Sequence, residues 1–122
     1  MLMKKGYLKS KAQMLLFEYR PAIWRQAAFE SVSGTENKVV QICKEQLRFT
    51  NEIVEMLRSN KLLGEKLYWI IYVSYMTERQ PGNIEDILAG IAQKYGHIPR
   101  RTYFRLKRRA IKMIDDLLIE IA

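Results

Sequence analysis

The sequence is poor in the side chains that build catalytic and metal sites. It has a single cysteine, Cys43, and a single histidine, His97, among its 122 residues. One cysteine cannot form an intramolecular disulfide bond, and a zinc site needs more thiolate and imidazole ligands than these two residues supply. No glycine-rich phosphate loop and no pair of nucleophile and general base is recognisable. We therefore expect a protein of a reducing compartment that is not an enzyme and needs no cofactor.

Long apolar segments are also missing. The longest strongly apolar stretch, LYWIIYVSYM at residues 67–76, is too short to cross a bilayer. The first residues, MLMKKGYLKSK, lack an apolar run followed by a small-residue cleavage site. We expect a cytoplasmic protein that does not bind a membrane.

Acidic residues are absent between Lys94 and Lys112. These nineteen residues hold eight of the 21 lysines and arginines, and the rest of the chain has thirteen basic and thirteen acidic residues. The formal net charge of +8 therefore lies in one segment. A neutral chain with one basic segment has the electrostatic footprint of a phosphate-binding surface. A solvated helix face would normally mix charges of both signs at spacings of four, and here no acid interleaves.

Apolar residues recur with the helical period in almost every segment, and none shows the strict alternation of a half-buried strand. The sequence predicts an all-α protein with a helical arm or hairpin in residues 1–60, for packing or oligomerisation, and a helix-turn-helix region in residues 61–122. In the arm, a first helix is expected from about Tyr7 to Tyr19, where the pair Arg20-Pro21 interrupts it, and a second to about Ser31.

The arm continues with an amphipathic helix over residues 36–60, for which Thr35 is a candidate cap. Its apolar side chains form a wide stripe, which needs a partner along its length. Two interpretations are open: packing against the first helix of the same chain, or a homodimer seam. The width favours packing within the chain, since a coiled-coil seam is narrow, and Cys43 is then a small core residue. The stripe consists of Val39, Val40, Ile42, Cys43, Gln46, Leu47, Phe49, Ile53, Val54, Met56 and Leu57.

The C-terminal region begins with a core helix, since KLLGEKLYWIIYVSYM is apolar nearly all round between Leu67 and Met76. Asn83 is expected to cap the next helix, IEDILAGIAQKYG, and Gly96 to end it. The last helix is expected to begin at about Pro99 or Arg100. The predicted buried face of the middle helix is Ile84, Ile87, Leu88, Ile91, Ala92 and Tyr95, and that of the last helix is Tyr103, Leu106, Ala110, Met113, Ile114 and Leu117.

Two helices joined by a short turn with glycine, the second exposing a basic edge from its first residue, predict a helix-turn-helix. Ile91, Ala92, Tyr95 and Gly96 match the usual order of an apolar residue, alanine, an apolar residue and glycine. The match requires one extra turn residue, the exposed His97. Ile98 is expected to plug the turn, and Pro99 replaces the serine or threonine that would often cap the second helix.

The stretches YWIIYVSYM, IEDILAGIAQKYG and IPRRTYFRLKRRAI together resemble the phage-encoded ArpU-type transcriptional regulators, whose C-terminal half is similar to the promoter-reading domain of bacterial sigma factors. The resemblance covers about residues 62–118, and RRTYFR carries most of its specificity. It implies a regulator of late genes of a phage or prophage, acting on bacterial promoters at the nucleoid of the host cell.

In helix-turn-helix proteins the N-terminal part of the second helix enters the major groove of double-stranded DNA, where each base pair displays a distinct pattern of groups. A guanidinium group pairs with guanine through two hydrogen bonds, and a phenyl ring contacts the thymine methyl group. This placement nominates as base-reading residues Arg100, Arg101, Phe104, Arg105 and Arg108. A second set is assigned to phosphates, which fix register without reading sequence: Lys94, Thr102, Lys107, Arg109 and Lys112.

Two function classes stay open. The first is a sequence-specific DNA-binding regulator. The second is a non-enzymatic interaction or DNA-packaging module, whose N-terminal helices contact RNA polymerase or a viral assembly protein while its basic helix binds DNA without reading sequence. Asp115, Asp116 and Glu120 are expected to be solvated acids on the outer face of the last helix, rather than members of a catalytic site.

Overall fold

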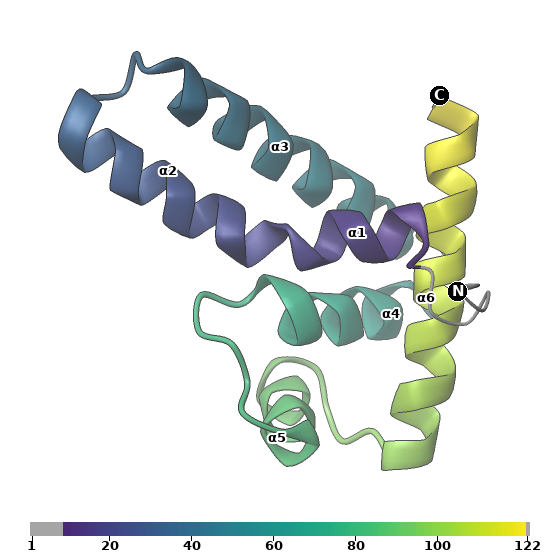
Figure 1. Cartoon of the computed structure of the whole chain (residues 1–122). Helices are drawn as coiled ribbons and strands as arrows, with labels where there is room; N and C mark the ends of the chain where they lie inside the picture. Colours follow the sequence, from purple (N-terminus) through teal and green to yellow (C-terminus); the bar gives the residue numbers. More distant parts are fainter. Residues whose placement is uncertain (1–8, 122) are drawn as a thin grey trace, which may run out of the picture.

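The structure, a computed structural model, describes residues 9–121, which form helices and the turns between them. No strand occurs in this range, so the predicted all-α fold is confirmed. In chain order the elements are α1 (Lys11–Phe17), α2 (Tyr19–Ser33), α3 (Lys38–Glu55), the 3-10 helix η2 (Met56–Ser59), α4 (Gly64–Ile71), the π-helical turn η3 (Tyr72–Met76), α5 (Ile84–Lys94) and α6 (Arg100–Ile121) (Figure 1).

Helices α1 and α2 follow one another with a break at Glu18 rather than at Arg20 and Pro21. Pro21 is the third residue of α2, where proline is tolerated because the N–H groups of the first turn have no partner within the helix. Ser10 caps α1, and its backbone N–H in turn donates to the Gln13 side chain at 3.0 Å. The predicted start of the first helix, Tyr7, lies outside the described residues.

Helices α2 and α3 form an antiparallel hairpin (Figure 1). The predicted cap Thr35 is wrong: α3 begins after Asn37, whose side chain accepts the Val39 N–H at 2.7 Å. Part of the predicted stripe packs within the chain, and Cys43 is buried as predicted. The predicted partner is wrong, because α3 packs along α2 rather than along the first helix. Two members of the stripe lie outside the packed face, since Ile42 is 66% exposed and Met56 is 44% exposed.

The core is built around α4 and η3, as predicted for this apolar segment. Between Leu67 and Met76 the buried apolar side chains are Leu67, Ile70, Ile71, Val73, Tyr75 and Met76. Side chains of α1 and α2, of α3 and η2, and of α6 join them in one hydrophobic cluster. Residues of the N-terminal arm and of the C-terminal region therefore pack together.

Hydrogen bonds of Arg20 and Ala12 connect the first helices to later parts of the chain. The guanidinium group of Arg20 donates to the carbonyl of Thr77 at 2.9 Å and to that of Ser74 at 3.3 Å, at the end of η3. The Ala12 N–H of α1 donates to the carboxylate of Asp115 at 2.8 Å. Asp115 is thus half-buried and hydrogen-bonded, and its prediction as a solvated acid is wrong. The pattern of α6 did not reveal this, because the partner lies 103 residues away in sequence.

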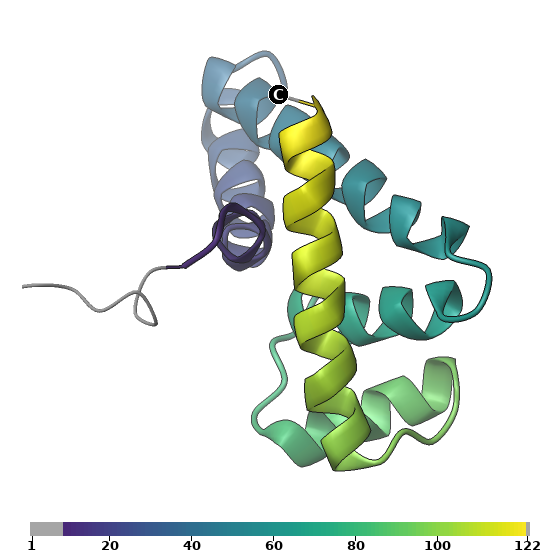
Figure 2. The ribbon, with the colours of Figure 1, turned by 90° about the vertical axis from the view of Figure 1, so that its right-hand side faces the viewer.

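Helix α6 runs along most of the height of the molecule (Figure 2). Its C-terminal half packs against α1 and the end of α3, and its N-terminal half packs on α4. The outer face of that N-terminal half, which carries the basic segment, is exposed.

Candidate nucleic-acid interface

The predicted order of helix, glycine turn and helix is confirmed. The Asn83 side chain accepts the Asp86 N–H at 2.9 Å and caps α5 as expected. At the other end, the N–H groups of Tyr95 and Gly96 both donate to the Ile91 carbonyl, at 2.8 and 3.1 Å. Gly96 has a φ of +154°, which side-chain-bearing residues rarely adopt. The turn leads from α5, which is seen nearly end-on in Figure 1, into the upright α6.

Helices α5 and α6 both contact η3. The ring of Tyr103 on α6 is fully buried, and its hydroxyl lies 2.7 Å from that of Ser74. Burial raises the pKa of Tyr103. On α5, Gly90 lies so close to η3 that a Cβ atom there would come within 2.8 Å of a Val73 methyl. Ile98 is 2% exposed and plugs the turn as predicted.

Two residues of the helix-turn-helix pattern are not on the buried face of α5. Ala92 is exposed because it lies about 100° around the helix from the buried Ile91. Tyr95 is 44% exposed because α5 ends at Lys94, so its backbone no longer follows the helix. The predicted burial of Ala92 and Tyr95 is therefore wrong, and the small residue closest to η3 is Gly90.

Four basic side chains form an exposed row along α6, opposite its buried apolar face: Arg101, Arg105, Arg108 and Lys112. A helix rises 1.5 Å per residue, so the row extends about 10 Å from Arg101 to Arg108. The major groove of B-DNA is about 12 Å wide and fits that length. Lys112 lies about 6 Å beyond Arg108 along the axis of α6.

The charges of this row are largely uncompensated. Among residues 9–121, no carboxylate lies within ion-pair distance of Arg101, Arg105, Arg108 or Arg109. Lys112 pairs with Asp116 at 3.6 Å.

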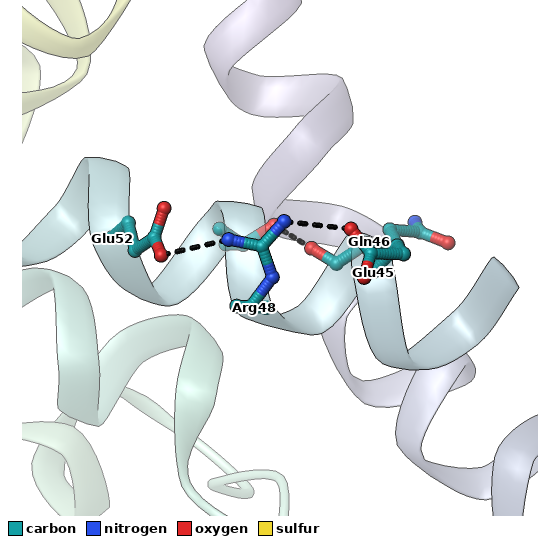
Figure 3. Close-up of polar contacts among 5 residues, drawn as sticks. Glu45, Gln46, Arg48 and Glu52 are labelled. Atoms are coloured by element: carbon teal, nitrogen blue, oxygen red, sulfur yellow. Dashed lines mark hydrogen bonds and ion pairs between the residues drawn. The ribbon is translucent and has the colours of Figure 1, made fainter. Parts of the chain in front are cut away.

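On the exposed face of α3, in contrast, an arginine is paired with acidic side chains of the same helix. Its Arg48 lies between Glu45, at 2.6 Å, and Glu52, at 2.9 Å (Figure 3). Pairs at spacings of three and four are usual on a solvated helix face. The exposed face at the start of α6 lacks them, and so presents its charge to an external anion.

Three of the predicted residues are engaged with neighbours. Arg100 pairs with Glu85 of α5 at 3.4 Å. Lys107 is half-buried, with its ammonium group 5.4 Å from the ring centre of Tyr75, and burial lowers its pKa. Phe104 is 38% exposed and makes an edge-to-face contact with the ring of Tyr103. The periodicity of α6 gave no sign of Glu85 or Tyr75, since both belong to other elements.

The remaining predicted residues flank the row. Lys94, in the last turn of α5, and Arg109 are exposed, and Thr102 is half-buried. His97 is exposed in the turn, as expected.

The start of α6 adds to the positive potential of this surface. Its first turn has no acidic residue and contains Arg100 and Arg101. The N-terminus of a helix is already positive, so each nearby cation costs about 0.3–1 kcal/mol. A bound phosphate oxygen would remove this repulsion and accept hydrogen bonds from the free N–H groups.

A metal centre would need several ligating side chains close together, and residues 9–121 contain no group of three or more histidine, cysteine or acidic side chains that could hold an ion. In the same range, no helix combines the length and the apolar character needed to cross a membrane. In comparisons with known proteins, no protein-family model, no curated protein and no solved structure matches the chain.

Proposed function

We propose that this protein is a sequence-specific DNA-binding regulator that places the N-terminal half of α6 in the major groove. The proposal rests on one observation: Arg101, Arg105 and Arg108 are exposed, lack acidic partners among the described residues and span about 10 Å at the start of one helix. Because Tyr103 fixes the opposite side of that helix, the guanidinium groups project from a rigid support.

Within this proposal the basic residues divide by position. Arg101, Arg105 and Arg108 read base edges, since guanidinium groups match the O6 and N7 acceptors of guanine. Arg109 and Lys112 contact phosphates on the rims of the groove. Lys107 contributes less directly, since its half-buried ammonium group lies over aromatic rings. Arg100 exchanges its pair with Glu85 for DNA, at small cost because an exposed ion pair contributes at most about 1 kcal/mol.

The resemblance to ArpU-type regulators extends the proposal to the genes controlled. By that resemblance the protein regulates late genes of a phage or prophage, in the cytoplasm of the bacterial host and at its nucleoid. The surface of α6 supports the DNA contact, and the resemblance alone supports the choice of promoters.

A second candidate is a DNA-packaging or scaffolding module that binds without reading sequence. One observation favours it: between Arg100 and Lys112 there is no asparagine or glutamine, the side chains that pair with adenine. If the protein does read sequence, this composition predicts guanine-rich contacts rather than adenine contacts.

Selection of bound duplexes from a random pool tests the proposal. A regulator should enrich a defined motif with guanines on the contacted strand, and one or two half-sites would report its stoichiometry. A modest excess of unrelated duplex should displace little of the protein from that motif. No enriched motif, together with displacement in proportion to unrelated DNA, would favour the packaging module.

A further inference from the structure

A hollow on the face between α3 and α6 plays no part in the proposed DNA contact. It has a volume of about 240 Å³, lies between η2 and the C-terminal half of α6, and is lined by Met56, Ser59, Met113, Asp116, Leu117 and Glu120. A second, open hollow adjoins it and is lined by Asn51, Glu52, Glu55 and Met56. Met56 is shared by both. The elements that form them lie side by side in the fold (Figure 1).

The charged side chains of the lining are all acidic, and its neutral polar side chains are Asn51 and Ser59. Met56, Met113 and Leu117 form an apolar floor, and the carboxylates are Glu52, Glu55, Asp116 and Glu120, with no lysine or arginine among the lining residues. The chain as a whole has a net charge of +8, so the sign of the charge that lines these hollows differs from that of the chain.

Most of these carboxylates already have partners, which lie outside the hollows. Arg48 pairs with Glu52 and Lys112 with Asp116, and both of these pairs are exposed. Arg58, which pairs with Glu55, is only 33% exposed and also pairs with Glu65. Exposed pairs contribute at most about 1 kcal/mol, so a cation brought by a ligand can replace them at small cost. Glu52, Asp116 and Glu120 are thus available to a basic ligand.

We propose that this surface, formed by the two adjoining hollows, binds a basic amphipathic helix of a partner protein. The partner would place apolar side chains one helical turn apart on Met56, Met113 and Leu117, and lysines or arginines beside Glu52 and Glu120. Methionine side chains adapt to differently shaped ligands, which suits such a floor.

Charge argues against the other occupants. A second copy of the chain in a two-fold interface would bring the same carboxylates of both copies together, and nucleic acid would bring phosphates to them. A basic partner meets opposite charge, which raises its association rate and its specificity.

Selection from a library of random peptides displayed on phage tests this proposal with the full chain. Peptides of about 16 residues are long enough for four helical turns. The variant Met56→Lys, which puts a cation on the floor, serves for counter-selection. Enriched peptides should carry a net positive charge and apolar residues at helical spacing. The synthetic peptides should bind saturably, as measured by fluorescence anisotropy.

Two substitutions that each add positive charge localise the binding. Glu120→Lys and Met56→Lys should each weaken the peptide about tenfold, which corresponds to about 1.4 kcal/mol. Glu78→Lys makes the same charge change as Glu120→Lys on the exposed loop between η3 and α5, and should leave the affinity nearly unchanged. Circular dichroism would verify that each variant remains folded.

Several outcomes would overturn the proposal. The selection could enrich no peptide that distinguishes the wild type from Met56→Lys, or it could enrich acidic peptides. Glu78→Lys could also weaken the peptide as much as Glu120→Lys does. Self-association detected by sedimentation and abolished by Met56→Lys would assign the surface to a second copy instead. No DNA is present in these measurements, so their failure is distinguishable from a failure of the proposed DNA binding.

Discussion

Arg105 gives the sharpest test of the proposed DNA contact. It lies between Arg101 and Arg108 in the exposed row, with no acidic partner among the described residues. Arg105→Ala therefore removes no ion pair among residues 9–121, and it shortens an exposed side chain. The free energy of unfolding should change by less than about 0.5 kcal/mol, the usual range for such surface substitutions. A change in DNA affinity would then report the contact itself.

The expected loss follows from the chemistry of guanine recognition. A bidentate arginine contact contributes about 1–3 kcal/mol of discrimination, so the affinity for the selected duplex should fall about 5-fold to about 150-fold. Discrimination should relax at one base position only. On random duplex the loss should be smaller, because only the attraction of one cation to the phosphates is removed. Titrations by fluorescence anisotropy at one fixed salt concentration measure all of these quantities.

Two matched variants complete the test. Arg48→Ala removes an arginine from the self-compensated face of α3, and should not change discrimination at any base position. Lys112→Ala should weaken all sequences alike, and the slope of log affinity against log salt should become shallower by about 0.9, because one phosphate is no longer neutralised. Equal losses on selected and random duplex for Arg105→Ala would refute base reading and favour the packaging module. An absence of DNA affinity even at low salt would refute both functions.

Three further predictions concern stability. Arg20→Ala should lower the free energy of unfolding by about 2–3 kcal/mol in denaturant titrations, because the charge-assisted bonds to the Ser74 and Thr77 carbonyls are removed; an unchanged value would contradict that role. Ile53→Asp should unfold the protein by circular dichroism, because Ile53 is 1% exposed and a buried carboxylate costs several kcal/mol; a folded monomer from a wild-type dimer would instead favour the dimer seam. Burial raises the pKa of Tyr75 to about 12. The neutral hydroxyl therefore stabilises the fold fully below pH 10, and this stabilisation is lost as the pH rises through 12. In denaturant titrations, the free energy of unfolding of Tyr75→Phe should fall less steeply with rising pH than that of the wild type.

The helices that the sequence predicted well are those whose apolar side chains follow one period. Helices α5 and α6 begin where Asn83 and Arg100 indicated, because local chemistry fixes those ends. The start of α3 was wrong because Thr35 and Asn37 are both capable caps, and the folded backbone decides between them. The break expected at Pro21 lies three residues earlier, at Glu18. The position of a proline does not fix the break, because proline fits the first turn of a helix as well as the residue after its end.

The exposed row of the candidate site could be predicted because it depends on one helix alone. Once Tyr103 and Leu106 are inside, the angular spacing of an α-helix puts Arg101, Arg105 and Arg108 outside. Contacts between elements could not be predicted in this way. The side chains of Arg100 and Lys107 are held by Glu85 and Tyr75, whose positions depend on how α5 and η3 pack.

The length of α6 explains how one helix can belong to the core and also present a basic surface. Its C-terminal half is fixed by buried Ile114 and by the hydrogen bond that Asp115 accepts from the first turn of α1. Its N-terminal half is fixed by Tyr103, which is hydrogen-bonded to Ser74. Both anchors lie off the exposed row, so substitution of the arginines should change binding without loosening the helix. Tyr103→Phe removes the hydroxyl that is hydrogen-bonded to Ser74 and changes no residue of the row. Any loss of DNA affinity in this variant would therefore come from a change in the position of α6.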